Sequence, residues 1–376
     1  MNLEVARLED SYDLIQFFKE FTVGDLIEFK IDRPTDFYLP YDIQSEQHVT
    51  YLLREPMDKS IQGVATFVIQ NVWLSDRLQT IAVARDLRIT PNRQAIMSWG
   101  QYFQPVLDEI QRAYGVDHFF SVLNMSEAKV LNTFIRPRQH KRSWPRYHLF
   151  RRFNLVSLHG ALPFASNPLP HMRIRKVDPS LHDSLMYYVL QKRKAKELSQ
   201  VYDRASFERY LKRWKNLKES DFYVALDAQD NIVGCVAPWS ANQIQEYIPY
   251  KYNNEAHNFR QFLKFGKWLG WTRTLTKPVP RLKREAPLNF RYLSCFLADN
   301  EDIFEALLWR VFHEIHPHEF LVYLQMRMDL HMRPPRGWIS ARLPYGLYCL
   351  VPHEKELPDF LHPSHDRPCD WEPFYV

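Results

Sequence analysis

The sequence lacks the features that mark several large classes of protein. No run of 18 or more uncharged apolar residues occurs, which argues against a membrane-spanning helix. The amino terminus lacks the basic-then-apolar layout of a secretion signal, so we expect a cytoplasmic protein. Glycine is scarce, with 10 residues against 25 prolines, and neither a Walker loop nor a dinucleotide-binding fingerprint is present. The Ser-His-Asp and Cys-His signatures of nucleophilic catalysis are also missing.

Cysteine is equally scarce, and its spacing does not indicate metal binding. The four cysteines are Cys235, Cys295, Cys349 and Cys369, and no two of them form a CxxC pair. This pattern signals neither a zinc site nor a redox pair. Because a free cysteine packs like a small apolar residue, we expect reduced and buried thiols.

Residues 313–319 read His-Glu-Ile-His-Pro-His-Glu, a composition that could hold a metal ion. The spacing is not that of HExxH, in which two histidines share one helix face. Pro317 also interrupts any helix between the candidate ligands. Histidines near a helix carboxyl end interact favourably with its dipole. We therefore expect a structural role and no bound metal.

The chain length favours two domains. At 376 residues, with 45% apolar and 25% charged residues, the composition is that of an ordinary globular protein. A proline-containing linker at 161–171 divides it into domains 1–160 and 172–351. The tail 352–376 is rich in proline and aromatic residues, and we expect it to pack on the body.

The expected strands and helices recur in the same order in both halves. Gly63-Val64 matches Gly234-Cys235, an offset of 171 residues, and residues 119–125 match 320–326, an offset of 201 residues. The larger offset requires extra residues in the second half, which fit at 241–289. The sequence therefore predicts an internal repeat with one insertion.

Residues 84–93, Ala-Arg-Asp-Leu-Arg-Ile-Thr-Pro-Asn-Arg, resemble the central strand and following turn of the GNAT superfamily of N-acyltransferases. In that family the strand separates from its neighbour, and the pantetheine arm of acyl-CoA pairs with its exposed backbone. The next helix binds the pyrophosphate, because its first N–H groups are unpaired and its dipole is positive there. The resemblance implies a mixed α/β protein with two tandem GNAT-like folds, each with its own sheet. It also implies acetyl-CoA or another acyl-CoA as cofactor.

The resemblance places cofactor contacts at the end of this strand, at the start of the next helix and after the following strand. The implied contacts are Leu87, Arg88, Ile89, Arg93, Gln94, Ala95, Ile96, Met97, Ser98 and Asn124. Ile96 and Ser98 stand where the family usually has glycine or alanine, whose small size allows close approach of a phosphate.

The family often uses a tyrosine as general acid a turn or two after the strand that precedes Asn124, but this region reads Leu131-Asn132-Thr133. The carboxylates nearest the implied cleft are Asp86 and Glu127, which are the candidate bases. Tyr147 is the candidate replacement for the missing acid.

The second copy departs further from the family pattern. After the expected strand 290–297 the chain reads Ala298-Asp299-Asn300-Glu301-Asp302. Carboxylates at a helix start repel a pyrophosphate. We therefore expect a degenerate second copy without a CoA site.

Acidic residues are absent between Glu127 and Asp178, and this stretch is rich in lysine and arginine. One interpretation is a solvated loop, a second is a clamp for the 3′-phosphate of CoA or for an acidic substrate, and a third is nucleotide or nucleic-acid binding. The candidate anion contacts are Arg136, Arg138, Lys141, Arg142 and Arg146.

Residues 259–274 carry bulky apolar side chains at helical spacing, interleaved with lysine and arginine. Core packing is the commoner explanation of such a stripe. A helix on a membrane surface has the same composition, and the position inside the insertion also suits a lid.

The function favoured by these observations is transfer of an acyl group from acyl-CoA, with acetyl-CoA expected, to an amine on a small molecule or other acceptor. The alternative is a non-catalytic, GNAT-derived receptor that binds a nucleotide or other anion through residues 136–152. A third hypothesis is a lipid-handling transferase, for which the two fused GNAT-like domains of N-myristoyltransferase are a precedent. We do not expect nucleic acid as a partner, and the oligomeric state stays open.

Overall fold

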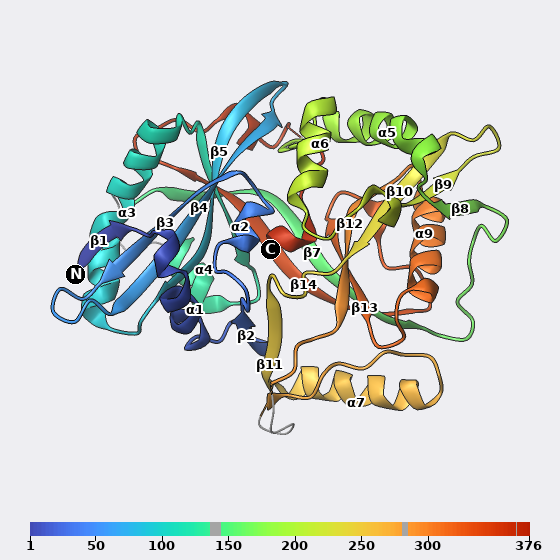
Figure 1. Cartoon of the computed structure of the whole chain (residues 1–376), viewed down its shortest axis with the longest axis horizontal. Helices are drawn as coiled ribbons and strands as arrows, with labels where there is room; N and C mark the ends of the chain where they lie inside the picture. The colour runs from blue at the N-terminus through green and yellow to red at the C-terminus, as the bar shows by residue number, and fades with distance from the viewer. Residues whose placement is uncertain (136–143, 280–284, 366) are drawn as a thin grey trace.

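The computed structural model describes residues 1–135, 144–279, 285–365 and 367–376. Within these residues twelve strands form one continuous sheet, in the order β1-β3-β4-β5-β6-β14-β7-β13-β12-β10-β9-β8 (Figure 1). Their bounds are β1 (Asn2–Val5), β3 (Gln47–Arg54), β4 (Ile61–Leu74), β5 (Arg77–Ile89), β6 (His118–Asn124), β7 (Arg146–Ala161), β8 (Arg173–Lys176), β9 (Tyr223–Leu226), β10 (Ile232–Trp239), β12 (Phe290–Ala298), β13 (Phe320–Met326) and β14 (Trp338–Val351). A separate two-stranded ribbon pairs β2 (Ile27–Asp32) with β11 (Glu246–Tyr252).

Helices cover both faces of this sheet. They are α1 (Ser11–Lys19), α2 (Leu39–Asp42), α3 (Arg93–Tyr114), α4 (Ala128–Phe134), α5 (His182–Lys194), α6 (Arg204–Arg213), α7 (Asn254–Trp268) and α9 (Glu301–Glu314). Alternate residues of β4 show the arrangement: Val64 and Val68 pack in the cluster with α1, whereas Ala65 and Phe67 pack in the cluster with α3. Within the described ranges no helix is both long and apolar enough to cross a bilayer.

The long helix α3 is delimited by local sequence signals. The Asn92 side chain accepts a hydrogen bond from the Gln94 N–H at 2.8 Å and caps the amino end. Gly115 ends the helix in the left-handed region, with φ 65°. Trp99 and Phe103 on the buried face fix α3 against the sheet.

Each half contains one parallel pair of strands, β5 with β6 and β12 with β13. The expectation of two separate sheets was wrong, because the central strands are exchanged. β14, which follows the second half, pairs with β6 of the first half, and β7 of the first half pairs with β13 of the second. β7 and β14 also pair with each other along most of their length. An apolar strand pattern does not encode which strand will be its neighbour, so this exchange carries no sequence signal. The domain boundaries at 160 and 172 stay a prediction.

The cysteines and the last residues of the tail lie in the core. Cys235, Cys295, Cys349 and Cys369 are all buried and free, which confirms the prediction for the thiols. The aromatic residues of the tail are buried as well: Trp371, Phe374 and Tyr375 are 7%, 1% and 3% exposed.

His159 at the end of β7 predicts a measurable pH dependence of stability. Burial lowers the pKa of His159 from 6.5 to about 3. Below pH 6.5 His159 is protonated in the unfolded chain but stays neutral in the folded chain. The free energy of unfolding therefore falls as the pH decreases toward 3. The expected slope is about 1.4 kcal/mol per pH unit from this group. Denaturant unfolding between pH 7 and 4 should show a shallower slope for His159→Gln than for wild type. Identical slopes would contradict a neutral, buried ring.

Candidate functional site

The two parallel strands of the first half diverge before they end. β5 pairs with β6 only where Ile81–Ala84 face His118–Ser121. Beyond that point β5 continues along β4 to Ile89, and β6 continues along β14 to Asn124. We call this divergence, between residues 85–89 of β5 and 122–124 of β6, the first wedge. One edge of β5 is thus left without a strand partner in the described structure, and an extended ligand with amide groups could pair with it.

Helix α3 begins directly beyond the first wedge. Arg93, Gln94, Ile96 and Met97 are exposed in its first two turns, and that first turn carries no acidic residue. Its first N–H groups therefore combine with a positive side chain at the positive end of a helix of 22 residues. Ala95 is buried beneath them. Of the remaining implied cofactor contacts, Leu87, Arg88, Ile89 and Ser98 are half-buried.

A β-bulge lies at the start of the first wedge. The register between β4 and β5 shifts between Val64 and Thr66, and Asp86 takes a left-handed conformation with φ 52°. A non-glycine residue in this region is strained by roughly 1–3 kcal/mol, so its surroundings must hold it there.

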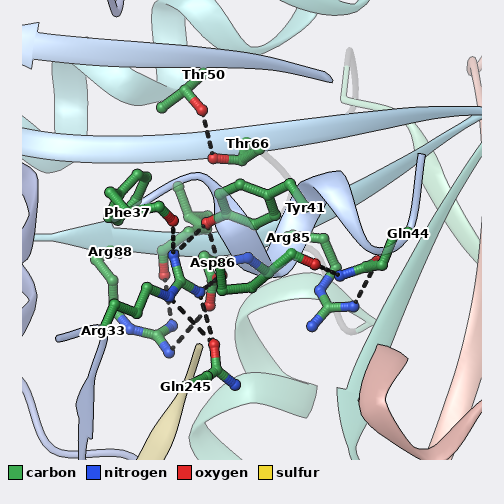
Figure 2. Close-up of polar contacts among 12 residues, drawn as sticks. Arg33, Phe37, Tyr41, Gln44, Thr50, Thr66, Arg85, Asp86, Arg88 and Gln245 are labelled. Carbon is green, nitrogen blue, oxygen red and sulfur yellow. Dashed lines mark hydrogen bonds and ion pairs between the residues drawn. The ribbon is translucent and has the colours of Figure 1, made fainter. Parts of the chain in front are cut away.

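The Asp86 side chain is held by a buried cation (Figure 2). The Arg33 guanidinium lies 2.5 Å from the Asp86 carboxylate, and the Tyr41 hydroxyl donates to the same oxygen at 2.8 Å. Arg33 is 2% exposed and packs over the rings of Phe37 and Tyr41. It also donates to the Gln245 side chain at 3.0 Å, which ties the bulge to the second half.

This environment decides the chemistry of Asp86. Burial alone would raise the pKa of its carboxyl, but the charges of Arg33, Arg88 and Arg85 outweigh burial and hold the pKa well below the usual range. A carboxylate that gives up its proton so readily is a poor base. The geometry therefore argues for a positioning role of Asp86 and against the base role expected from sequence.

Glu127 and Asn124 lie together at the end of β6. The Asn124 amide donates to the Glu127 carboxylate at 3.1 Å, and its oxygen accepts the Ser126 N–H at 2.9 Å. Across the strand pair Asn124 faces Tyr345. Burial, together with the neighbouring Tyr247 and Glu127, raises the pKa of Tyr345. Glu127 is half-buried, and among the described residues its carboxylate is bonded to this amide and not to a cation.

The structure does not bring Tyr147 and Arg146 close to Asn124 and Glu127. They lie at the start of β7, opposite Leu350 and Val351, whereas Asn124 is level with the middle of that strand pair, opposite Tyr345. Burial raises the pKa of Tyr147, and Arg146 is hydrogen-bonded to His353 at 2.8 Å. The other candidate anion contacts fall outside the described residues; these are Arg136, Arg138, Lys141 and Arg142.

The second half repeats the wedge and the bulge. β12 pairs with β13 only over Phe290–Tyr292, and the register between β10 and β12 shifts between Cys235 and Ala237. Cys295 sits at this bulge with φ 48°, in the position that Asp86 holds in the first half. We call the divergence between residues 293–298 and 323–326 the second wedge.

The chain fills the second wedge with its own tail. The Glu372 carboxylate accepts the Cys295 N–H at 3.1 Å and the Tyr210 hydroxyl at 2.7 Å, and it is ion-paired with the buried Arg193. Phe374 follows and packs on the ring of Trp239, with centroids 5.0 Å apart. The helix beyond this wedge, α9, starts with Glu301 and Asp302, as the sequence predicts. At the first wedge the tail contacts Arg85, whose guanidinium donates to the Tyr375 carbonyl at 2.6 Å.

The histidine cluster at the end of α9 makes local contacts. The His313 ring bonds to the Trp309 carbonyl at 2.7 Å, and the rings of His316 and His318 lie against each other, with centroids 5.1 Å apart. Across the described ranges, no group of three or more His, Cys, Asp and Glu side chains is arranged to hold a metal ion.

Comparison with known proteins shows the fold. No protein-family model matches the chain, and no curated protein matches its sequence. A glucosamine N-acetyltransferase region of a fungal multi-domain β-N-acetylglucosaminidase, described as GCN5-related, aligns with a TM-score of 0.58 at 12% identity, over 93% of this chain and 38% of that one. Saccharomyces cerevisiae N-myristoyltransferase with bound myristoyl-CoA aligns with a TM-score of 0.50 at 10% identity, over 93% of this chain and 78% of that one. The protein therefore has the GNAT fold. More particularly, it has two GNAT-like halves in tandem, which confirms the fold expected from residues 84–93.

The buried ion pair at the bulge can be tested against a matched surface pair. Asp86→Asn leaves Arg33 buried without its counter-charge and should lower the free energy of unfolding by about 3 kcal/mol. Asp76→Asn is the control: Asp76 also has a left-handed φ, of 62°, and lies 2.5 Å from an arginine, Arg367, but both side chains are largely exposed. It should cost less than about 1 kcal/mol. Chemical denaturation of both variants measures the difference. Equal losses in the free energy of unfolding would show that the buried ion pair contributes no more to stability than the exposed one.

Proposed function

We propose that the protein is an acyl-CoA-dependent N-acyltransferase with a single acyl-CoA site in the first wedge. The observation that carries this proposal is the unpaired edge of β5 leading into the exposed start of α3, while the second wedge holds Glu372. The fold shared with a myristoyl-CoA-bound transferase supports it.

The cofactor would be held mainly by backbone. The amides of the pantetheine arm would pair with residues 87–89, and the pyrophosphate would lie against the N–H groups of Gln94 to Ser98, with Arg93 beside it. Ile96 is 54% exposed, so its side chain lies largely in solvent although it replaces a usual glycine. Asn124 would contact the acyl-CoA from the β6 side.

The reaction would transfer the acyl group directly. The acceptor nitrogen forms a bond to the thioester carbonyl carbon, the C–S bond breaks, and the nitrogen passes a proton to a base. Glu127 is the better candidate for that base, because Asp86 is paired with the Arg33 guanidinium, whereas the donor to the Glu127 carboxylate among the described residues is the Asn124 amide. Backbone N–H groups at the bulge would stabilise the oxyanion.

The proposal is tested by the thermal stability of the protein with acetyl-CoA and with myristoyl-CoA. A ligand at about 100 times its Kd stabilises the folded state by roughly 2.7 kcal/mol, which should raise the Tm by about 2–4 °C. Arg93→Glu should abolish the increase, because it places a like charge beside the pyrophosphate. The matched control is Asp302→Ala at the start of α9, the equivalent helix of the second half, and it should leave the increase unchanged.

Catalysis is tested separately with Glu127→Gln. This variant should keep the thermal shift but release CoA from acyl-CoA and an amine acceptor on the order of 100-fold more slowly. Absence of any shift at millimolar acyl-CoA would overturn the proposal. The receptor hypothesis would then lead, and nucleotides would be the next ligands to assay.

A further inference from the structure

Four large aromatic side chains stand exposed on and just after α7. Phe262, Phe265, Trp268 and Trp271 are 48%, 60%, 80% and 37% exposed, and we call them the α7 aromatic surface. Exposed aromatic residues gathered on one element mark an interaction site more often than scattered ones do. The interpretation of this stripe as core packing is therefore wrong for these residues.

The opposite face of α7 is what holds the helix in place. Ala256, Leu263 and Gly266 are buried, and a Cβ atom on Gly266 would lie only 2.7 Å from the Thr272 side chain. The Thr272 hydroxyl donates to the Leu263 carbonyl at 2.5 Å, and Arg260 donates to the Leu275 carbonyl at 3.2 Å. Trp271 joins this anchoring through its backbone, which bonds to Gly266 and Ala161. The contacts named above do not involve Phe262, Phe265 or Trp268, so they give no structural reason for those exposed rings.

The charged residues between Phe262 and Lys277, the stretch of chain that carries the aromatic surface, are all basic. Lys264 and Lys267 are exposed on α7 beside the aromatic residues, and Lys277 is exposed shortly after it. The sequence has no acidic residue between Glu255 and Glu285. Aromatic rings with flanking lysines fit the interface of an anionic bilayer, where the rings enter the headgroup region and the ammonium groups meet lipid phosphates.

The location of α7 leaves this surface accessible. In Figure 1 the helix is the outermost element at the lower edge of the molecule, with the β11 ribbon beside it. Thr272 bridges to Gly160 at the end of β7, which places the helix at that edge of the sheet. Tyr250 on β11 is also 38% exposed.

We propose that the α7 aromatic surface, with Lys264 and Lys267, docks the protein on an anionic lipid bilayer. A symmetric dimer through the same surface would bring the lysines of two copies together, and like charges oppose that arrangement. An anionic partner satisfies both the aromatic rings and the lysines. The inference concerns this surface alone and does not depend on the acyltransferase proposal.

Vesicle flotation tests the proposal. The full-length protein is mixed with vesicles of phosphatidylcholine and phosphatidylglycerol at 70:30 by mole, or of phosphatidylcholine alone, in about 0.1 M salt. We expect the wild type to float with the anionic vesicles and much less with the neutral ones. Phe265→Ser/Trp268→Ser should weaken binding on the order of tenfold or more. Lys264→Glu/Lys267→Glu should have a similar effect on anionic vesicles only.

Tyr187→Ser is the matched control, because Tyr187 is 68% exposed on α5, away from α7, and should bind as wild type. Thermal melts verify that each variant is folded. Two results would overturn the proposal: wild type that stays with the pellet at millimolar anionic lipid, or an aromatic variant that floats as wild type does. Sedimentation equilibrium tests for a dimer. A concentration-dependent dimer that is lost in Phe265→Ser/Trp268→Ser and does not respond to lipid would show that a second copy covers this surface, and would overturn the proposal.

Discussion

The exchange of the two central strands is the constraint on which the rest of the structure depends. β14 completes the first half and β7 joins it to the second, so neither half has a finished sheet without the other. The hydrogen bonds between β7 and β14 run through the middle of the continuous sheet, where both faces are covered by side chains. The long separation in sequence of these partners makes the pairing slow to form but hard to open locally. The two wedges are consequently held in a fixed relation.

The two halves of the sheet carry different residues at equivalent bulges. In the first half the bulged residue is Asp86, whose carboxylate turns to Arg33. In the second half it is Cys295, and a carboxylate from the tail, Glu372, comes to its N–H. Each half therefore holds a buried arginine beside its bulge, paired with Asp86 in the first half and with Glu372 and Asp370 in the second. The difference is where the carboxylate comes from: the bulged residue itself in the first half, and the tail in the second.

Much of the fold could be predicted from local sequence. The resemblance of residues 84–93 to a GNAT strand and turn, together with the repeated order of strands, led to a GNAT-like fold in each half, and the acidic start of α9 led to a degenerate second copy. These features depend on neighbours in sequence, which is why they could be read directly.

The site contacts that were missed all join distant parts of the chain. Arg33 reaches Asp86 and Gln245, which are 53 and 212 residues away, and Arg193 reaches Glu372 over 179 residues. A lone arginine before a proline, as at Arg33-Pro34, has no pattern that reveals a buried partner. The spacing in sequence likewise indicated the position of Asp86 on the strand but not the cation paired with its carboxylate, which argues against the base role expected for it. Tyr147 was a candidate replacement for the missing acid, whereas strand register sets it at the start of β7, opposite Leu350 and away from Asn124.

The direction of the strands explains how the second half serves the first. β5 and β6 run antiparallel to β12 and β13, because β7 is antiparallel to both β14 and β13. The two wedges therefore open in opposite directions along the strands. β12 begins on the side of the sheet where β5 ends. Gln245 and Thr272 of the insertion 241–289 lie on that same side. There the Gln245 side chain accepts a hydrogen bond from the Arg33 guanidinium, which in turn is paired with Asp86. A half whose own wedge is filled thus contributes a contact to the wedge of its neighbour. This relation gives a physical reason for retaining a closed second copy: removing it would take away both the strand partner of β7 and the acceptor that orients Arg33.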